Sequence, residues 1–302
     1  MILVTGADGF VAHHLVSRLA ENGEEPIRAL VRNSQKARTV LTSRDAQIFV
    51  GDTTRPESLE AALVGVDTII HGAFIVAIRK EGPGSRYNET NVLGTKNLLE
   101  AARKAGVRRI CVLGGLGTKP STTDHYLQGR FEADEAVRNS GMAWSIIGPS
   151  VQFGEHAAFI SGLVDLIRSA PVVPMVGDGK RLFQPIWVED VVTCVVKMIR
   201  EPNRYDGHYI EVGGPNIYTY AQILDMLMQS MGTRKPKVGA PVPLVRLGAA
   251  MMEVALKKPP ITRAAVGLFD FDNITAEDSV SSNFDFTPLS FETYLATHGI
   301  EP

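Results

Sequence analysis

The sequence predicts an α/β protein: a doubly wound parallel sheet of about seven strands, with a second domain that is smaller and mostly helical. In the first 115 residues, short apolar runs rich in β-branched residues alternate five times with amphipathic segments. This order is typical of a parallel sheet with crossover helices. The alternation stops after residue 154, and most of residues 215–302 have helical spacing, which indicates a separate domain.

The first nineteen residues combine a strand, a glycine turn and a helix start. Residues 1–5 are an apolar run bounded by Gly6, and residues 13–19 have helical spacing. Gly6 permits a sharp turn, Gly9 lets the backbone approach a pyrophosphate, and a helix N-terminus supplies N–H groups to phosphates. In this context the glycines predict a dinucleotide site, although an ordinary strand–turn–helix has the same pattern. The expected cofactor contacts here are Gly6, Asp8, Gly9, Phe10 and Val11.

The end of the second predicted strand, over residues 26–31, bears on the choice of cofactor. Enzymes that prefer NAD usually place an acid there, which binds the ribose 2′-hydroxyl. Here the run Arg32-Asn-Ser-Gln-Lys36 contains no acid. A guanidinium pairs well with a 2′-phosphate that a carboxylate would repel, so Arg32 favours NADP(H) over NAD(H). The alternative is that Arg32 is a solvated charge at a strand end.

Two further strand ends supply candidate cofactor contacts. Asp52 ends the strand predicted over residues 47–52 and Thr53 follows it. The Asp52 carboxylate could reach an adenine amino group, cap the next helix, or do both. The strand predicted over residues 67–73 ends in Gly72 and Ala73, which are small enough for a cofactor to lie close. His71 in the same strand is expected to be packed in the interior.

The bulk properties exclude several classes of protein. The chain has 302 residues, 44% hydrophobic and 21% charged, with a net charge of −2 and no long basic run. A nucleic acid is therefore not an expected partner. No apolar run reaches the roughly 18 residues of a membrane span, and no cationic leader precedes the first strand, so we expect a cytoplasmic protein. Cys111 and Cys194 lie in apolar runs and predict buried thiols, and no Cys/His spacing predicts a metal site.

Seven motifs spread over nearly the whole chain carry a resemblance to a known family. They are Thr5-Gly-Ala-Asp-Gly-Phe-Val11, Gly51-Asp52, Asn91-Val-Leu-Gly-Thr95, Tyr126-Leu-Gln-Gly-Arg130, Pro149-Ser-Val-Gln-Phe-Gly154, Pro185-Ile-Trp-Val-Glu-Asp-Val191 and Gly213-Gly-Pro215. With these motifs the chain resembles the extended and atypical short-chain dehydrogenase/reductase family, which is epimerase/dehydratase-like and has a Rossmann fold. It is similar to the branch that contains the nucleotide-binding accessory subunit of respiratory complex I and free-standing bacterial relatives.

The resemblance implies NAD(P)-linked oxidoreductase or epimerase chemistry on a small organic substrate. In the family a tyrosine exchanges a proton with the substrate oxygen, a lysine four residues later lowers the tyrosine pKa and holds the nicotinamide ribose, and a serine or threonine polarises the same oxygen. Residues i and i+4 share a helix face, which puts the cation beside the phenol. The resemblance thus implies Tyr126 and Arg130 as the catalytic positions in this chain, and both are expected to contact the cofactor as well. The resemblance further implies cofactor contacts at Gly114, Pro149 and Val151.

The chain departs from the family pattern at three places. Arg130 replaces the lysine, which keeps the charge but changes its shape. The run Gly114-Gly-Leu-Gly-Thr118 replaces the usual serines, and Thr118 lies four residues past the usual position. Gly148 stands where relatives often carry arginine. The expectation is an NADPH-dependent oxidoreductase with a degenerate Ser-Tyr-Lys site that acts on a carbonyl, an alcohol or an activated double bond. The alternatives are a non-catalytic NAD(P)-binding structural or sensor protein and a sugar-nucleotide-type epimerase/dehydratase.

The expected domains are a cofactor-binding part, residues 1–154 plus 184–214, and a substrate-binding part, residues 155–183 plus 215–302, in a monomer or homodimer. Six residues are the best candidates for the substrate pocket and suit an apolar or ring-containing substrate, although core aromatics are equally plausible. They are Gln152, Phe153, His156, Phe183, Gln184 and Trp187. The apolar residues 243–256, followed by Lys257 and Lys258, predict a packed helix or a surface for a membrane or an apolar ligand.

Overall fold

The computed structural model describes residues 1–23, 26–41, 46–82, 86–121, 125–257, 259 and 261–300. The chain divides into two compact units, each with its own hydrophobic core. The first unit contains Met1–Ile75, Glu81–Gly148 and Val191–Ile210, and the second contains Val76–Lys80, Pro149–Asp190 and Glu211–Pro302. The short segment Val76–Lys80 thus belongs with the second unit, although it interrupts the first in sequence. Lys258 lies outside the described residues.

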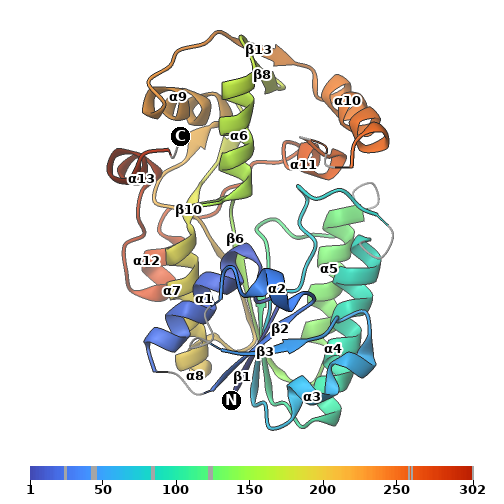
Figure 1. The fold of residues 1–302 in the computed structure, drawn as a ribbon. Helices are drawn as coiled ribbons and strands as arrows, with labels where there is room; N and C mark the ends of the chain where they lie inside the picture. Colours follow the sequence, from blue (N-terminus) through green and yellow to red (C-terminus); the bar gives the residue numbers. More distant parts are fainter. Residues whose placement is uncertain are drawn as a thin grey trace. The chain divides into compact units, whose positions relative to one another are not determined.

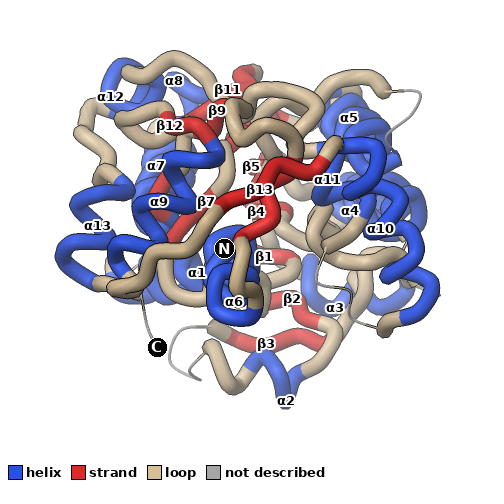
Figure 2. The backbone as a smooth tube through the Cα atoms, turned by 90° about the horizontal axis from the view of Figure 1, so that it is seen from above, coloured by secondary structure: helices blue, strands red, loops and turns tan. Residues whose placement is uncertain are grey.

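A seven-stranded sheet in the order β11-β6-β5-β4-β1-β2-β3 forms the centre of the first unit (Figures 1 and 2). The five strand pairings among β1, β2, β3, β4, β5 and β6 are all parallel. Its strands are β1 (Ile2–Thr5), β2 (Ile27–Val31), β3 (Gln47–Val50), β4 (Thr68–His71), β5 (Arg109–Leu113), β6 (Ala143–Pro149) and β11 (His208–Val212). This is the doubly wound Rossmann arrangement that the sequence predicts, so the predicted fold class is confirmed.

Helices flank this sheet, which explains why its central strands are apolar on both faces. Leu3, Ile69, Ile110 and Ile146, one each from β1, β4, β5 and β6, are completely buried. The main helices are α1 (Phe10–Glu21), α2 (Ser34–Ala37), α3 (Glu60–Leu63), α4 (Gly94–Lys104), α5 (His125–Arg138), α7 (Val188–Arg200) and α8 (Pro202–Tyr205). Cys111 and Cys194 are both free and buried, as expected.

The second unit is mostly helical, as predicted, with short strand pairs. Its helices are α6 (Ala158–Ser169), α9 (Tyr220–Ser230), α10 (Val242–Ala255), α11 (Arg263–Gly267), α12 (Ser279–Phe284) and α13 (Phe291–His298). Thr219 caps α9: Thr219 Oγ1 accepts from the Gln222 N–H at 3.2 Å, and Gln222 Oε1 accepts from the Thr219 N–H at 2.7 Å. No helix in the described parts of the chain is both long and apolar enough to cross a bilayer.

One local expectation in this unit is wrong. The Pro/Gly-rich stretch 171–179 is predicted to be a turn, but it contains the strand β8 (Val173–Val176). β8 pairs in parallel with β13 (Lys237–Ala240), and Val173 lies opposite Lys237. Because its partner comes sixty-four residues later (237 − 173), no local pattern indicated this strand.

Aromatic side chains fill the core of the second unit. Phe153 and Phe183 are completely buried, and their ring centroids lie 5.0 Å from Phe291 and 5.3 Å from Phe269, respectively. Gln184 is also completely buried, and its amide donates to the Gly214 carbonyl at 2.8 Å. These three residues therefore belong to the core and are wrong as substrate-pocket candidates.

The other three pocket candidates are not fully buried. Gln152 and Trp187 are half-buried, and Trp187 packs its ring 6.4 Å from that of Tyr294. His156 is exposed, has a positive φ of 64°, and lies 3.2 Å from the Glu155 carboxylate.

Candidate functional site

The glycine turn after β1, residues 6–9, has no room for a side chain at Gly6 or Gly9. Gly6 has a φ of +63°, and its N–H donates to the Leu30 carbonyl at 3.0 Å. A Cβ atom on Gly6 would lie 2.8 Å from both Ala73 Cα and the Gly72 oxygen, and a Cβ on Gly9 would lie 2.9 Å from the Gly6 oxygen. Both positions therefore require glycine, as the sequence predicts.

Helix α1 begins directly after this turn, and its N-terminus carries no side-chain cap because its N-cap is Gly9. The first N–H groups of a helix have no intrahelical acceptor, and the aligned peptide dipoles leave a positive partial charge there. Phe10 and Val11 occupy the first two helical positions, so their N–H groups are suited to a phosphate. This turn, which has no side chain at Gly6 or Gly9, lies at a helix N-terminus and fits a dinucleotide pyrophosphate.

The strand order reverses at the same place. β1 pairs with β2 on one side and with β4 on the other, and ligands of doubly wound sheets bind at such a switch point, beyond the carboxyl ends of the strands. Gly72 follows β4 there, and a Cβ on it would lie 2.9 Å from Leu113 Cδ1 and 3.2 Å from the Thr5 oxygen. The small residues Gly72 and Ala73 thus form the wall that faces Gly6.

A buried polar network supports this wall. His71 Nδ1 lies 2.7 Å from Thr5 Oγ1, and His71 Nε2 lies 2.9 Å from Thr95 Oγ1. Thr95 Oγ1 donates its hydrogen to the Asn91 carbonyl at 2.6 Å, so it accepts from His71 Nε2–H, and His71 Nδ1 accepts from Thr5. Burial, together with the nearby Arg130 charge, lowers the pKa of His71 to about 3. His71 is therefore a neutral, packed histidine, as expected.

Asn91 extends the support beyond the strand. Its side chain accepts from the Ile75 N–H at 2.8 Å and donates to the Ile75 carbonyl at 3.1 Å. The Gly72 N–H also donates to Thr5 Oγ1, at 3.3 Å. The motif from Asn91 to Thr95 therefore fixes the backbone that leaves β4.

Two cations, Arg32 and Lys36, lie near the end of β2, and only Arg32 was predicted to bind the cofactor. Arg32 is exposed, and Asn33 caps α2 by accepting from the Lys36 N–H at 3.0 Å. Lys36 Nζ then reaches Asp8 Oδ2 in the glycine turn at 2.8 Å. No local signal indicated this contact, because Lys36 and Asp8 are 28 residues apart in the sequence.

At the end of β3 the two candidate residues have local structural roles. Asp52 Oδ1 accepts from the N–H and the hydroxyl of Thr54, both at 2.9 Å, and thereby closes a turn. The following 3-10 helix, Pro56–Ser58, has Arg55 as its N-cap, so the expected helix-capping role of Asp52 is wrong. Thr53 is 3% exposed and packs against Gly94. Their contacts with a cofactor stay predictions.

Arg130 anchors α5 at the carboxyl ends of β4 and β5. Its guanidinium donates to the Leu113 carbonyl at 3.1 Å and lies 3.6 Å from the centroid of the Phe74 ring, while the side chain is only 3% exposed. Tyr126 lies one helical turn earlier and is half-buried, with its ring 5.3 Å from that of Tyr87. In this structure Arg130 is thus held by protein groups, and its contact with a nicotinamide ribose stays a prediction.

A buried carboxylate accompanies Arg130. Asp134 follows it by one turn, and Arg130 Nη2 lies 3.8 Å from Asp134 Oδ1. Within the described chain neither Asp134 oxygen has a hydrogen-bond partner of good geometry. Burial raises the pKa of Asp134, and the charges of Arg130 and Arg138 partly oppose this effect.

The segment after β5 explains two departures from the family pattern. Thr118 Oγ1 and the Tyr209 hydroxyl both donate to the Gly115 carbonyl, at 2.7 and 2.6 Å. The Thr118 hydroxyl hydrogen is therefore engaged within its own loop. A Cβ on Gly148 would lie 2.8 Å from the Tyr209 hydroxyl oxygen, so this tyrosine requires glycine at 148. Gly114 is equally restricted, because a Cβ there would lie 2.5 Å from the Ile147 oxygen.

The last two predicted cofactor residues, Pro149 and Val151, belong to the second unit. The Val151 N–H donates to Asn273 Oδ1 at 2.8 Å.

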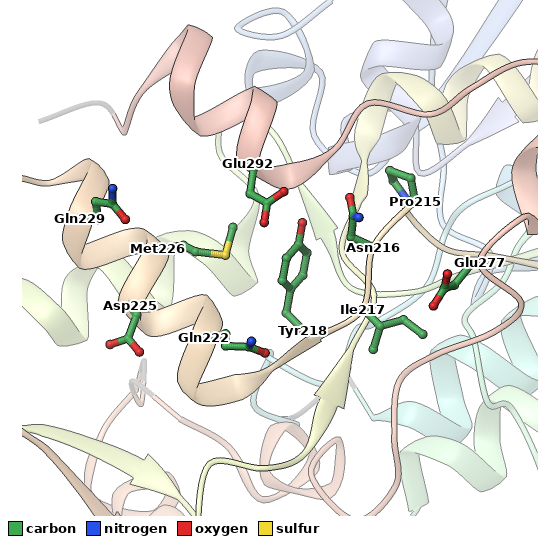
Figure 3. A pocket seen from close by; sticks show the side chains of 10 residues that line it. All are labelled: Pro215, Asn216, Ile217, Tyr218, Gln222, Asp225, Met226, Gln229, Glu277 and Glu292. Atoms are coloured by element: carbon green, nitrogen blue, oxygen red, sulfur yellow. The ribbon is translucent and has the colours of Figure 1, made fainter.

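A cavity of about 450 Å³ also lies in the second unit (Figure 3). Tyr218, Glu277 and Glu292 are among its lining residues, and burial and the Glu292 carboxylate raise the pKa of the Tyr218 phenol. None of the predicted cofactor residues lines this cavity.

The fold and the glycine turn after β1 define a dinucleotide-binding α/β protein. Residues 6–155 match a protein family described as NAD(P)H-binding. The chain therefore carries an NAD(P)-binding domain of this family, with homologues in the NAD-dependent epimerase/dehydratase superfamily, including complex I subunit 9-like proteins. The predicted family relationship is confirmed.

Individual relatives extend the similarity over most of the chain. It is 23% identical over 277 residues to NADH dehydrogenase [ubiquinone] 1 alpha subcomplex subunit 9 of Arabidopsis thaliana, covering 90% of this chain and 68% of that protein. It is 28% identical to the ceramide reductase of Caulobacter vibrioides, covering 84% and 77%. The fold is similar to an NADPH-dependent quinone oxidoreductase of Escherichia coli in complex with NADPH, with a TM-score of 0.75, 17% identity and coverage of 98% and 99%.

Proposed function

We propose that this protein is an NADPH-dependent oxidoreductase of the short-chain dehydrogenase type, which reduces or oxidises a small organic carbonyl, alcohol or activated double bond. The observation that carries the proposal is the anchoring of α5. Arg130 ties this helix to the Leu113 carbonyl and the Phe74 ring, beyond the ends of β5 and β4. Tyr126, one turn earlier, lies on the same face of this helix as Arg130, which supports its proposed role beside the cofactor.

In this proposal the phenol of Tyr126 exchanges a proton with the substrate oxygen, and Arg130 positions α5 and favours the phenolate by its charge. The glycine turn and the first N–H groups of α1 hold the pyrophosphate. When bound, NADPH would supply the hydride for reduction and NADP⁺ would accept it for oxidation. A relative that is a ceramide reductase supports an apolar substrate.

The test is NADPH oxidation at 340 nm with a panel of aldehydes, ketones and quinones. Tyr126→Phe should abolish turnover and leave NADPH affinity nearly unchanged, because only the proton donor is removed. Tyr87→Phe is the matched control, since it removes a hydroxyl from the other ring of the same pair and should retain activity. Full activity in Tyr126→Phe would contradict this assignment.

A non-catalytic nucleotide-binding protein is the second candidate. The burial of Arg130 and the engaged Thr118 hydroxyl favour it, because the family's lysine and serine roles then have no direct equivalent. Loss of one donor to a reacting oxygen typically costs about 10²–10³ in rate. Tight NADPH binding without turnover on any member of the panel would support this candidate over the first.

The proposed preference for NADPH over NADH rests on Arg32 and Lys36. Hydrogen bonds to charged groups contribute about 1.5–3 kcal/mol, so each cation that contacts the 2′-phosphate should improve NADPH affinity by roughly 10- to 150-fold. Calorimetric titration should show this preference in the native protein, and Arg32→Ala and Lys36→Ala should each reduce it. Arg38→Ala, an exposed arginine just beyond α2, is the control. Equal affinity of the native protein for both cofactors would refute the preference.

A further inference from the structure

Helix α10 exposes an unusual apolar face. Only Ala249 of its fourteen residues is buried. Leu244, Leu247, Met251 and Val254 are exposed by 63, 60, 66 and 89%, respectively. Spacings of three, four and three residues put these four side chains on one side of the helix.

The segment Val76–Lys80 adjoins this helix within the second unit. Lys80 Nζ donates to the Leu256 carbonyl at 3.1 Å, and the Thr262 hydroxyl donates to the Ala77 carbonyl at 2.5 Å. Thr262 caps α11, which packs against α10. Together these segments carry an exposed apolar surface that we call the α10 patch. It consists of Val76, Ile78, Leu244, Leu247, Met251, Val254 and Leu256.

The charges at the α10 patch are predominantly positive. Arg246 pairs with Asp270 at 2.7 Å and Arg263 pairs with Glu253 at 2.8 Å, so these four charges balance. The segments 76–80 and 256–257 add Lys80 and Lys257, and they contain no acid. The apolar face is therefore bordered at one end by an excess of positive charge.

We propose that the α10 patch docks on the surface of a bilayer that contains anionic lipids, with α10 lying in the plane of the interface. An apolar helix face with basic residues at its margin is the combination that binds such surfaces, and large exposed apolar patches on soluble domains mark interaction sites. This surface attachment needs no membrane-spanning helix, and it does not depend on whether the protein turns over a substrate.

The excess positive charge argues against a second copy of this chain as the occupant. A two-fold interface apposes the same surface patch of both copies. Lys80 and Lys257 would then meet the same positively charged surface, on which the described acids Glu253 and Asp270 are already paired with arginines. An anionic lipid surface is complementary to these charges instead.

The test is flotation of the full chain with phosphatidylcholine vesicles, made with and without phosphatidylglycerol. We expect binding to the anionic vesicles that weakens as salt is raised. Leu247→Ser/Met251→Ser should reduce binding by roughly tenfold or more, because two apolar side chains leave the interface. Lys80→Glu and Lys257→Glu should each reduce it by roughly fivefold or more, the equivalent of about 1 kcal/mol per basic residue near the surface.

Val50→Ser/Val64→Ser is the matched control, since these valines are 62 and 66% exposed on the first unit. It should bind vesicles like the native chain, and every variant should retain native NADPH affinity as evidence of folding. The proposal is overturned if the Leu247→Ser/Met251→Ser variant floats like this control, or if phosphatidylcholine alone binds equally well. It is also overturned if light scattering shows a native dimer that this variant converts to a monomer without any vesicle binding.

Discussion

The buried pair of Arg130 and Asp134 gives a quantitative test of what Arg130 does. In Arg130→Met the chain loses a hydrogen bond from a charged donor, about 1.5–3 kcal/mol, and a desolvated contact with the Phe74 ring, about 2 kcal/mol. The Asp134 carboxylate also stays buried without its nearest cation. We therefore expect the free energy of unfolding to fall by about 3–5 kcal/mol, the usual cost of breaking a buried ion pair.

The double variant Arg130→Met/Asp134→Leu should recover most of this loss, because no uncompensated charge is then buried. The decrease in the free energy of unfolding that Arg130→Met causes should also become larger as the pH rises. Without Arg130 the pKa of Asp134 rises further, so the folded state retains a proton that the unfolded state has already released. Urea denaturation followed by circular dichroism measures these differences.

Arg130→Lys separates the structural role from the ribose contact. Lysine keeps the charge but cannot lie flat on the Phe74 ring, so we expect a moderate loss of stability and little change in NADPH affinity. Two results together would refute the buried ion pair. They are a decrease of less than about 1 kcal/mol in the free energy of unfolding of Arg130→Met, and a double variant that is no more stable than Arg130→Met. In that case a large loss of NADPH affinity in Arg130→Lys would favour the ribose contact.

Three further changes test the site and its surroundings. Gly6→Ala should abolish NADPH binding in a calorimetric titration, because Gly6 has a positive φ and a Cβ would meet the Ala73 backbone at 2.8 Å; retained binding would contradict the proposed role of the glycine turn. The pKa of His71 falls from its ordinary 6.5 to about 3 on folding, so its contribution to stability is lost as the pH falls from 6.5 towards 3, and urea midpoints should show a shallower dependence in His71→Gln. Burial raises the pKa of Asp190 from 3.8 to about 6, so stability should fall as the pH rises across this range. Asp190→Asn, which keeps an acceptor for the Leu289 N–H, should remove that slope, and an unchanged profile would refute the assignment.

The sheet was predictable because each central strand is a continuous apolar run followed by a turn, and those signals are local. The glycine turn was predictable for the same reason, since a strand, Gly6, Gly9 and a helix start follow one another directly. Strand β8 was not predictable, because it forms a strand by pairing with β13, which lies far along the chain.

The surroundings of the site were less accessible to sequence reasoning. Phenylalanines such as Phe153 and Phe183 are common both in substrate pockets and in aromatic cores. Only the packing of the folded chain shows that these two belong to the core. Arg130 was placed by its spacing from Tyr126, but spacing does not tell whether a guanidinium faces a ligand or a buried ring. The burial of both Arg130 and Asp134 is a property of the assembled fold.

The contact between Gly148 and Tyr209 constrains how this sequence can change. The two residues lie on β6 and β11, which are neighbours in the sheet, and the tyrosine hydroxyl reaches on to the Gly115 carbonyl. Any side chain at 148 would collide with that hydroxyl, so position 148 can gain a side chain only after position 209 has lost its tyrosine or the ring has moved. The two positions should therefore covary among close relatives, with a large residue at 148 accompanied by a smaller one at 209. If the Tyr209 ring does not move, placing the arginine that the family resemblance implies at 148 would require two substitutions, with the change at 209 made first.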